Sequence, residues 1–286
     1  MKNLLLILLC LPVIGFGQNV YIPDANFKAY LVGSTSPSGI NTNGDNEIQV
    51  SEAAAYAGTL DCNGLSISDL TGLEAFTSII KLWCDDNQLT SLDVSANTAL
   101  ETLNCYDNQL TSLDVSQNTA LEALWCWENQ LTSLDVSQNT VLYVLECGGN
   151  NLIKLDLSNN PNLEELHCPE NLLNCLNLKS GGNQNIYHIT ADDQDALSLS
   201  CVEVDDLAYS NSNWISNPDF YFDIGVSFSE NCNNDCSNSS TLVLDIGHKN
   251  KILLKTIDIF GRETKQTNQI LFYIYDDGTV EKRINI

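Results

Sequence analysis

The sequence predicts a mainly β solenoid in which short coils stack on one another and share one continuous core. Cysteines recur every 21 residues, and two sets of asparagines keep the same spacing. A fixed period of this length indicates a repeat architecture, because one unit cannot bury its own apolar residues whereas stacked units can. The three ladders are Cys84, Cys105, Cys126, Cys147 and Cys168; Asn87, Asn108, Asn129, Asn150 and Asn171; and Asn97, Asn118, Asn139 and Asn160.

Each unit reads LxxLxCxxNxLxxLDVSxNTx, with apolar residues that alternate over two short segments. Alternation predicts two strands per unit, each closed by an asparagine turn. Because an asparagine amide is both a donor and an acceptor, we expect both asparagine ladders to satisfy backbone groups at the corners of the coils. The cysteines take a core position and are expected to stay unpaired, since side chains that point the same way from stacked strands have poor disulfide geometry. A ladder with one thiol per coil also lacks the local cysteine pair of a zinc site.

This pattern resembles the bacterial leucine-rich repeat proteins in which LxxLxLxxNx occurs twice per unit. The resemblance covers about residues 62–178, and SISDLTGLEAFTSIIKL, residues 66–82, resembles the internalin-type repeat that often begins such arrays. It implies a right-handed leucine-rich repeat solenoid of short strands with few helices. We therefore expect residues 18–61 to form a small helical N-terminal cap, and residues 179–240 to form a C-terminal cap and linker.

The first 17 residues, MKNLLLILLCLPVIGFG, have the features of a signal peptide. Lys2 is followed by an apolar run, and Gly15 and Gly17 occupy the small-residue positions before Gln18. No later stretch is long enough and apolar enough to span a bilayer. The sequence thus predicts a protein that is secreted or displayed on a bacterial cell surface.

The last segment, residues 241–286, is expected to form a small β module with a DDGT turn at 276–279. KTIDIFGRE, followed by FYIYDDGTVEKRI, resembles the C-terminal sorting domains of proteins exported by the bacterial type IX secretion system. The resemblance implies that this secretion machinery is a partner. Seven of the twelve Lys and Arg residues lie in the last 38 positions, so the polar stretch ENCNNDCSNSS, residues 230–240, marks the expected boundary.

Cys62 precedes the ladder by 22 residues and is counted with it, which leaves four cysteines outside both the signal peptide and the ladder: Cys175, Cys201, Cys232 and Cys236. An oxidising compartment predicts two disulfides among them, with three possible connectivities. CVEVDDLAYSNSNWISN, followed by VSFSENC, resembles the C-terminal cap of secreted bacterial repeat proteins, and this resemblance favours Cys201 with Cys232. Cys175 aligns with serines at solvent-facing positions of earlier units, which would leave it able to pair with Cys236.

Composition and motifs exclude several functions. The formal net charge is −25, which repels nucleic acids and anionic lipids. His167, His188 and His248 lie in three different segments, and none belongs to a nucleophile or metal-hydrolase motif. We therefore expect a protein that is not an enzyme, with a glycan- or peptide-processing enzyme as a less favoured alternative.

The stretch INTNGDNEIQVSE, residues 40–52, resembles a calcium loop of the EF-hand type. The departures are an asparagine where that loop has its glycine, and a preceding helix, PDANFKAYLV, that is separated from the loop. The alternative is an Asx-rich turn that leads to a helix capped by Ser51. The residues that would bind calcium are Asn41, Asn43, Asp45, Glu47 through its carbonyl, and Glu52 with both carboxylate oxygens.

The two outward-facing surfaces of the repeats differ in variability. The second segment repeats one solvated pattern, as in Ser112, Asp114 and Ser116, whereas the first strand changes from unit to unit. Clustered aromatic residues on that strand predict a face that binds a protein or a glycan. Packing between neighbouring coils and a purely structural role as a surface spacer or coat are the alternatives. The predicted binding residues are Trp83, Tyr106, Trp125, Trp127, Glu146 and His167.

Overall fold

The computed structural model describes residues 17–33, 37–194, 199–232 and 236, together with the backbone of three C-terminal strands. The chain divides into two compact units, residues 1–238 and 239–286. The first unit holds the repeats and both caps, and the second holds the small β module. Apart from Gly17, the expected signal peptide lies outside the described residues.

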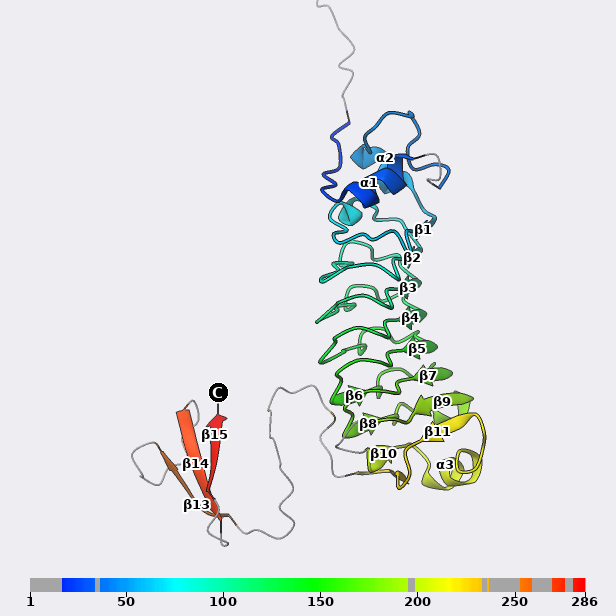
Figure 1. Cartoon of the computed structure of the whole chain (residues 1–286). Coiled ribbons are helices and arrows are strands. Elements are labelled where there is room, and N and C mark those ends of the chain that lie inside the picture. The colour runs from blue at the N-terminus through cyan, green and yellow to red at the C-terminus, as the bar shows by residue number, and fades with distance from the viewer. Residues whose placement is uncertain are drawn as a thin grey trace, which may run out of the picture. The chain divides into compact units, whose positions relative to one another are not determined.

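The first unit is a mainly β solenoid of stacked coils, as the repeat pattern predicts (Figure 1). The first strands of successive coils form one parallel eight-stranded sheet along one side. Neighbouring strands are in register, for example Leu103 with Leu124. The strands, in sheet order, are β1 (Thr59–Asp61), β2 (Lys81–Trp83), β3 (Thr102–Asn104), β4 (Ala123–Trp125), β5 (Val144–Glu146), β7 (Glu165–His167), β9 (His188–Ala191) and β11 (Phe220–Phe222).

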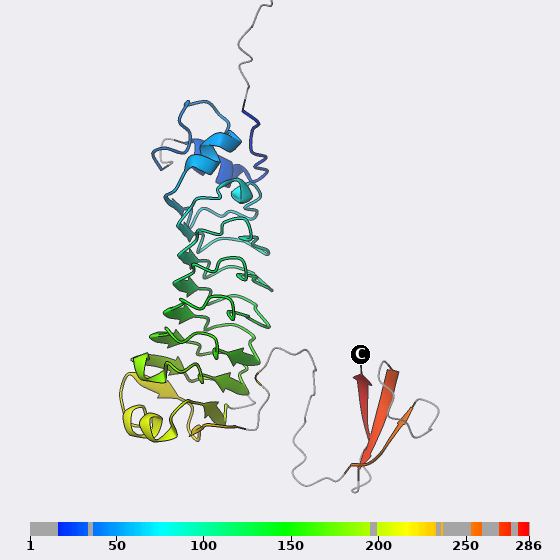
Figure 2. The same cartoon turned by 180° about the vertical axis from the view of Figure 1, so that it is seen from behind.

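A second parallel sheet lies toward the C-terminal end of the solenoid, and Figure 2 shows it from behind. Its order is β12 (Ser227–Ser229), β10 (Cys201–Glu203), β8 (Cys175–Asn177) and β6 (Lys154–Asp156). The prediction of two strands per unit is therefore wrong for the earlier coils, where the second segments contain no strand among the described residues. There Asp93, Asp114 and Asp135 accept hydrogen bonds from the backbone N–H two residues on, each at 2.9 Å. Asp156 accepts the same bond from the Ser158 N–H at 3.0 Å although it lies in β6, so this bond does not prevent a strand. Pairing begins where TSLDVS gives way to IKLDLS.

The core is a stack of equivalent side chains from successive coils. Leu103, Leu124 and Leu145 are fully buried, and so are the ladder cysteines. The cysteines are unpaired, which confirms that they serve as core residues.

The two asparagine ladders behave differently. In the first ladder, Asn108 Oδ1 accepts from the Leu89 N–H at 2.9 Å, and Asn108 Nδ2 donates to the Cys84 carbonyl at 3.0 Å. In the second ladder, Asn118 Nδ2 donates to two carbonyls, but Asn118 Oδ1 has no partner among the described residues. The expectation that both ladders act as donor and acceptor is thus wrong for the second, because no backbone N–H lies within reach of its amide oxygen.

The N-terminal cap contains α1 (Ala25–Val32) and α2 (Val50–Ala55). Asp24 caps α1 and also accepts from Ser68 N–H at 2.9 Å, which ties the cap to the first repeat. The cap of α2 is Gln49, in a capping box with Glu52, so the expectation of Ser51 is wrong. Ser51 lies inside the helix because the helix begins at Val50, one residue before Ser51. A short 3-10 turn, η1 (Leu73–Ala75), follows in the first repeat.

The C-terminal cap contains η2 (Asn183–Asn185) and α3 (Leu207–Asn213). After α3, Trp214 is buried and stacks on Phe220, with ring centroids 5.3 Å apart. This packing closes the last open coil.

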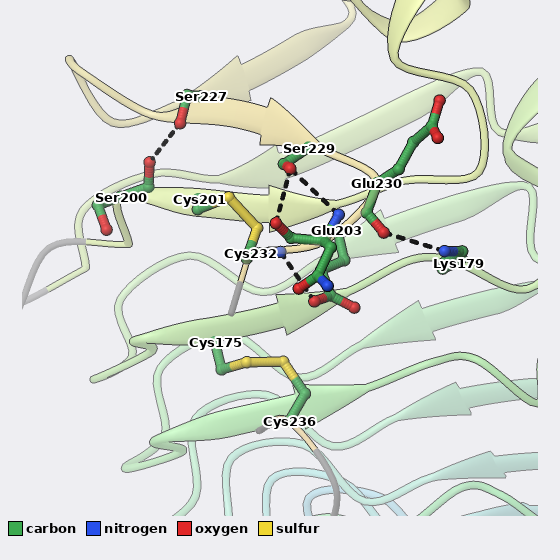
Figure 3. The surroundings of a disulfide bond; sticks show 11 residues. Cys175, Lys179, Ser200, Cys201, Glu203, Ser227, Ser229, Glu230, Cys232 and Cys236 are labelled. Atoms are coloured by element: carbon green, nitrogen blue, oxygen red, sulfur yellow. Dashed lines mark hydrogen bonds between the residues drawn. A yellow bond between two sulfur atoms is a disulfide. The ribbon is translucent and has the colours of Figure 1, made fainter. Parts of the chain in front are cut away.

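Two disulfides fix the end of this cap, and Figure 3 shows their surroundings. They join Cys201 to Cys232 and Cys175 to Cys236, with Cα–Cα distances of 5.8 and 5.5 Å. The predicted exposure of Cys175 is wrong: the residue is buried, because the bonded Cys236 covers it.

The second unit is an antiparallel three-stranded sheet in the order β13 (Leu253–Asp258), β14 (Gln269–Tyr275) and β15 (Val280–Asn285). The expected DDGT turn at 276–279 lies outside the described residues. Within the part of the chain that the structure describes, no helix has the length and apolarity needed to cross a membrane.

Candidate functional site: an aromatic hollow on the first-strand face

The register of the parallel sheet places the outward side chains of the first strands in straight rows. One row consists of residues paired in register from strand to strand: Trp83, Asn104, Trp125, Glu146, His167 and Thr190. A second row lies two residues further along each coil and contains Asn63, Asp85, Tyr106 and Trp127. Stacked strands are about 4.8 Å apart, so members of a row can contact one another directly.

These two rows border a hollow of about 380 Å³, which we name the aromatic hollow. Its volume lies within the range of about 300–1,000 Å³ that is common for small-ligand sites. Four rings, two carboxylates and two amides line it, and no basic side chain does. The lining residues are Asn63, Trp83, Asp85, Asn104, Tyr106, Trp125, Trp127 and Glu146.

The rings are held in place by contacts between neighbouring coils. Tyr106 and Trp127 stack with centroids 4.7 Å apart and planes 11° apart. Trp125 Nε1 donates to Glu146 Oε1 at 2.8 Å. Trp83 is 37% exposed and has no such partner among the described residues. The hollow therefore combines rings of fixed orientation with an accessible ring at one end.

Asp85 is the buried carboxylate of the hollow, with 5% of its surface exposed. It accepts from Asn104 Nδ2 at 3.0 Å. Burial raises the pKa of Asp85, since desolvation disfavours its charged form. The nearby Asp85 charge in turn raises the pKa of Tyr106. A cation in the hollow would favour the charged form of Asp85 and so lower its pKa again.

A line of exposed acidic residues, which we name the acidic row, runs beside the hollow: Asp86, Asp107 and Glu128. All three have left-handed backbone, with φ of 53°, 48° and 51°. Glycine, asparagine and aspartate adopt this conformation most readily, so Glu128 is the member of the row for which it is costly. Gly149 continues the row at φ 59°, and a Cβ there would lie 3.1 Å from Glu128 Cδ, so glycine makes room for Glu128.

His167 lies beyond the hollow rather than in it. Its Nδ1 contacts Thr190 Oγ1 at 2.9 Å, and its ring lies 4.6 Å from that of His188. Burial lowers the pKa of His167. The two histidines are 21 residues apart, so the repeat spacing alone would pair them. The unit between β7 and β9 is two residues longer than most others, so His188 pairs with Glu165 and lies diagonal to His167.

The structure thus brings together Trp83, Tyr106, Trp125, Trp127 and Glu146 and leaves His167 outside. Asn63 and Asn104 also line the hollow, although the sequence did not single them out as site residues. Both lie at outward first-strand positions, so the alignment of the units could have identified them.

The loop that resembles a calcium site uses its polar groups internally. Glu52 Oε1 accepts from Thr42 N–H at 2.8 Å, and Asp45 Oδ1 accepts from Glu47 N–H at 2.7 Å. The Glu47 carboxylate forms an ion pair with Lys28 at 2.8 Å, and Asn41 Oδ1 accepts from Gly44 N–H at 2.9 Å. These bonds match the Asx-turn interpretation. Calcium binding here stays a prediction, which calorimetric titration with Ca²⁺ would test.

The chemistry available at the hollow is that of recognition. Its aromatic faces and carboxylate oxygens can stack, accept hydrogen bonds and attract positive charge. Among the described residues, no group of three or more His, Cys, Asp or Glu side chains is placed to hold a metal ion.

The repeats and their stacking define a leucine-rich repeat solenoid, and no family model matches the chain. The chain is 40% identical over 80 residues to internalin J from Listeria monocytogenes serotype 4b (strain F2365), a match that spans 28% of this chain and 8% of that protein. The matched part is thus internalin-like, and the comparisons indicate no enzyme family.

Two solved structures are also similar. The functional domain of InlJ from Listeria monocytogenes, which includes a cysteine ladder, is 29% identical with a TM-score of 0.38, over 65% of this chain and 52% of that one. Internalin C2 from Listeria monocytogenes strain 4b F2365 is 17% identical with a TM-score of 0.47, over 73% of this chain and 94% of that one.

Proposed function

We propose that this chain is a non-enzymatic recognition or adhesion protein that binds a protein or a glycan through the aromatic hollow. The observation that supports this most is the gathering of four rings and two carboxylates on one face of coils whose other face repeats a single polar pattern. Exposed aromatic clusters mark interaction sites, and tryptophan and tyrosine dominate the binding energy of interfaces.

The fixed orientation of the rings adds to this argument. The Tyr106 and Trp127 stack and the Trp125 to Glu146 hydrogen bond restrict three of the four rings before any ligand arrives. A site that is ordered in advance loses less conformational entropy on binding. A protein that acts only as a surface spacer has no need for rings that are ordered in advance.

The test is screening of the full chain on a glycan microarray and a protein microarray, beside a Trp125→Ala/Trp127→Ala variant. We expect binding to at least one array that falls at least tenfold in the variant, since each aromatic hot spot contributes about 2 kcal/mol. The matched control is Ser112→Ala/Ser133→Ala, on the other face of this coil and the preceding one, which should bind as the parent does. Circular dichroism must show that both variants fold.

Binding that survives loss of both tryptophans would show that the face is wrong. Absence of any binder on both arrays would favour the structural spacer or coat protein instead. Turnover of an arrayed glycan or peptide by the purified protein would overturn the non-enzymatic assignment.

The same proposal includes secretion or surface display, with the C-terminal unit as a type IX sorting signal. It is supported by the resemblance of residues 241–286 to sorting domains and by their separation as a compact unit. Deletion of these residues should trap the protein in the periplasm of its native host. Normal delivery of the truncated protein to the surface would overturn the sorting role.

A further inference from the structure

The aromatic hollow offers ring faces, carboxylate oxygens and some free donors. Asn104 Nδ2 and Trp125 Nε1 already donate to Asp85 and Glu146. The second carboxylate oxygen of Glu146 makes no hydrogen bond among the described residues. The lining also contains the indole N–H groups of Trp83 and Trp127, so the balance of donors and acceptors alone does not select the ligand.

The ring faces and the carboxylates suit one type of ligand in particular. A guanidinium group has five donors and no acceptor, and it also stacks on aromatic faces. The four rings and the free carboxylate oxygen of Glu146 can hold such a group.

Charge favours the same ligand. No lining residue is basic, and the nearest basic residue on these strands, Lys81, lies two positions before Trp83 at the other end of β2. The three carboxylates of the acidic row make no ion pair among the described residues. Like charges on neighbouring coils repel one another, and a cation from outside would relieve that repulsion. The net charge of −25 would also speed the approach of a basic partner.

We propose that the aromatic hollow binds an arginine side chain of a basic protein segment, whose neighbouring positive charges lie along the acidic row. The guanidinium stacks on the rings and donates to Glu146 and Asp85, while the rest of the segment lies across Asp86, Asp107 and Glu128. This inference rests on the proposed function and specifies the partner as a protein with exposed arginines rather than a neutral glycan.

The test uses two fluorescent peptides, hexa-arginine and hexa-citrulline, with the full chain in an anisotropy titration. Citrulline has nearly the shape of arginine but no charge, so the pair isolates the guanidinium charge. We expect hexa-arginine to bind at least about tenfold more tightly than hexa-citrulline, and its affinity to fall as salt rises. Trp125→Ala/Trp127→Ala should weaken hexa-arginine binding about tenfold, because cation–π contacts are lost.

A matched pair of variants separates the site from general attraction to an acidic protein. Asp86→Asn/Asp107→Asn/Glu128→Gln removes the acidic row, and Asp93→Asn/Asp114→Asn/Asp135→Asn removes the same charge from the other face of the coils. The first should weaken hexa-arginine binding about tenfold and the second less than about threefold, because exposed charges beyond a Debye length are screened.

Three results would overturn the inference. Equal losses in the two triple variants, or no loss in the tryptophan variant, would show that hexa-arginine binds by net charge alone. Equal affinity for hexa-citrulline would show that charge is not recognised. Binding of a neutral oligosaccharide such as chitohexaose or cellohexaose that needs the tryptophans and is not displaced by hexa-arginine would establish a sugar site. That last result would leave the proposed recognition function intact.

Discussion

The first-strand face and the second-segment face of the solenoid are built on the same coils yet differ in what they carry. The first-strand face changes at every coil and holds the four rings of the aromatic hollow. The second-segment face repeats one aspartate that caps its own turn, as Asp114 does with the Ser116 N–H at 2.9 Å. The repeat thus specifies the scaffold at inward and turn positions, while the outward positions of the paired strands are free to vary from coil to coil.

The largest effect that we expect concerns the buried side chains beneath the two faces, which titrate under one face and not under the other. Cysteines lie under the first strands, where burial raises the pKa of Cys62, Cys105 and Cys147 from 9.0 to about 12. Valines such as Val94, Val115 and Val136 are buried under the second segments and do not titrate.

Between about pH 9 and pH 12 the unfolded chain therefore binds fewer protons than the folded one, so stability should fall as pH rises. Below about pH 9 the thiols are protonated in both states, and their burial does not lower stability. Above about pH 9, each buried thiol should lower the free energy of unfolding by about 1.4 kcal/mol per pH unit. Urea unfolding measured over this range checks the prediction. Cys105→Ala should be less stable at neutral pH but should show a shallower decline, and equal slopes would contradict the account.

The second prediction compares the asparagines under each face. Asn129→Ala removes a partner from the Leu110 N–H and from the carbonyls of Cys105 and Cys126. Asn118→Ala removes partners from two carbonyls only. Since each buried group left unsatisfied costs about 1–3 kcal/mol, we expect a loss of about 3 kcal/mol for Asn129→Ala and about 2 kcal/mol for Asn118→Ala. Chemical denaturation would measure both, and a larger loss at Asn118 would reverse the assignment of the ladders.

The cysteine and asparagine ladders also show which features of the fold can be predicted from the sequence. The 21-residue spacing predicts the solenoid, the buried cysteines and the first strands because equivalent positions of stacked coils must have equivalent surroundings. It does not predict that Asn118 Oδ1 has no partner, since that depends on which backbone N–H lies within reach.

The members of the aromatic hollow could also be predicted only in part. Tryptophans spaced by whole units indicate a shared face, so Trp83 and Trp125 could be placed together before the structure was known. The burial of Asp85 could not, because it depends on how Asn104 and Tyr106 of the next coil pack over it. The 21-residue spacing of His167 and His188 indicates neighbouring positions, but the longer unit between their strands makes the contact diagonal rather than directly opposite.

A third, smaller effect should come from the stack on the first-strand face. A double-mutant cycle with Tyr106→Ala and Trp127→Ala should give a coupling free energy of about 0.5–1.5 kcal/mol in thermal or urea unfolding, since aromatic pairs contribute that much beyond their buried area. A coupling indistinguishable from zero would show that the rings are not held in place before binding.

The smallest effect is expected on the second-segment face. Asp114→Ala removes an exposed carboxylate whose pKa is lowered by hydrogen bonds from the Ser116 backbone and side chain. The loss should stay below about 0.5 kcal/mol, as for most surface substitutions. A group with a lowered pKa stabilises the fold above its unfolded pKa and loses this contribution as pH falls. The difference between parent and variant should therefore vanish in acid, and a difference that grows in acid would contradict this.

The most direct measurement of the central claim is hydroxyl-radical footprinting of the full chain with and without its strongest binder from the arrays. If the aromatic hollow is the binding site, Trp83, Tyr106, Trp125 and Trp127 become protected from oxidation, because the ligand covers them. The reference positions are Leu92 under the second-segment face, Tyr21 before the N-terminal helices and Tyr221 in the C-terminal cap, which should react equally in both states. Protection of any of these three with the four rings unchanged would show that the protein binds its ligand elsewhere.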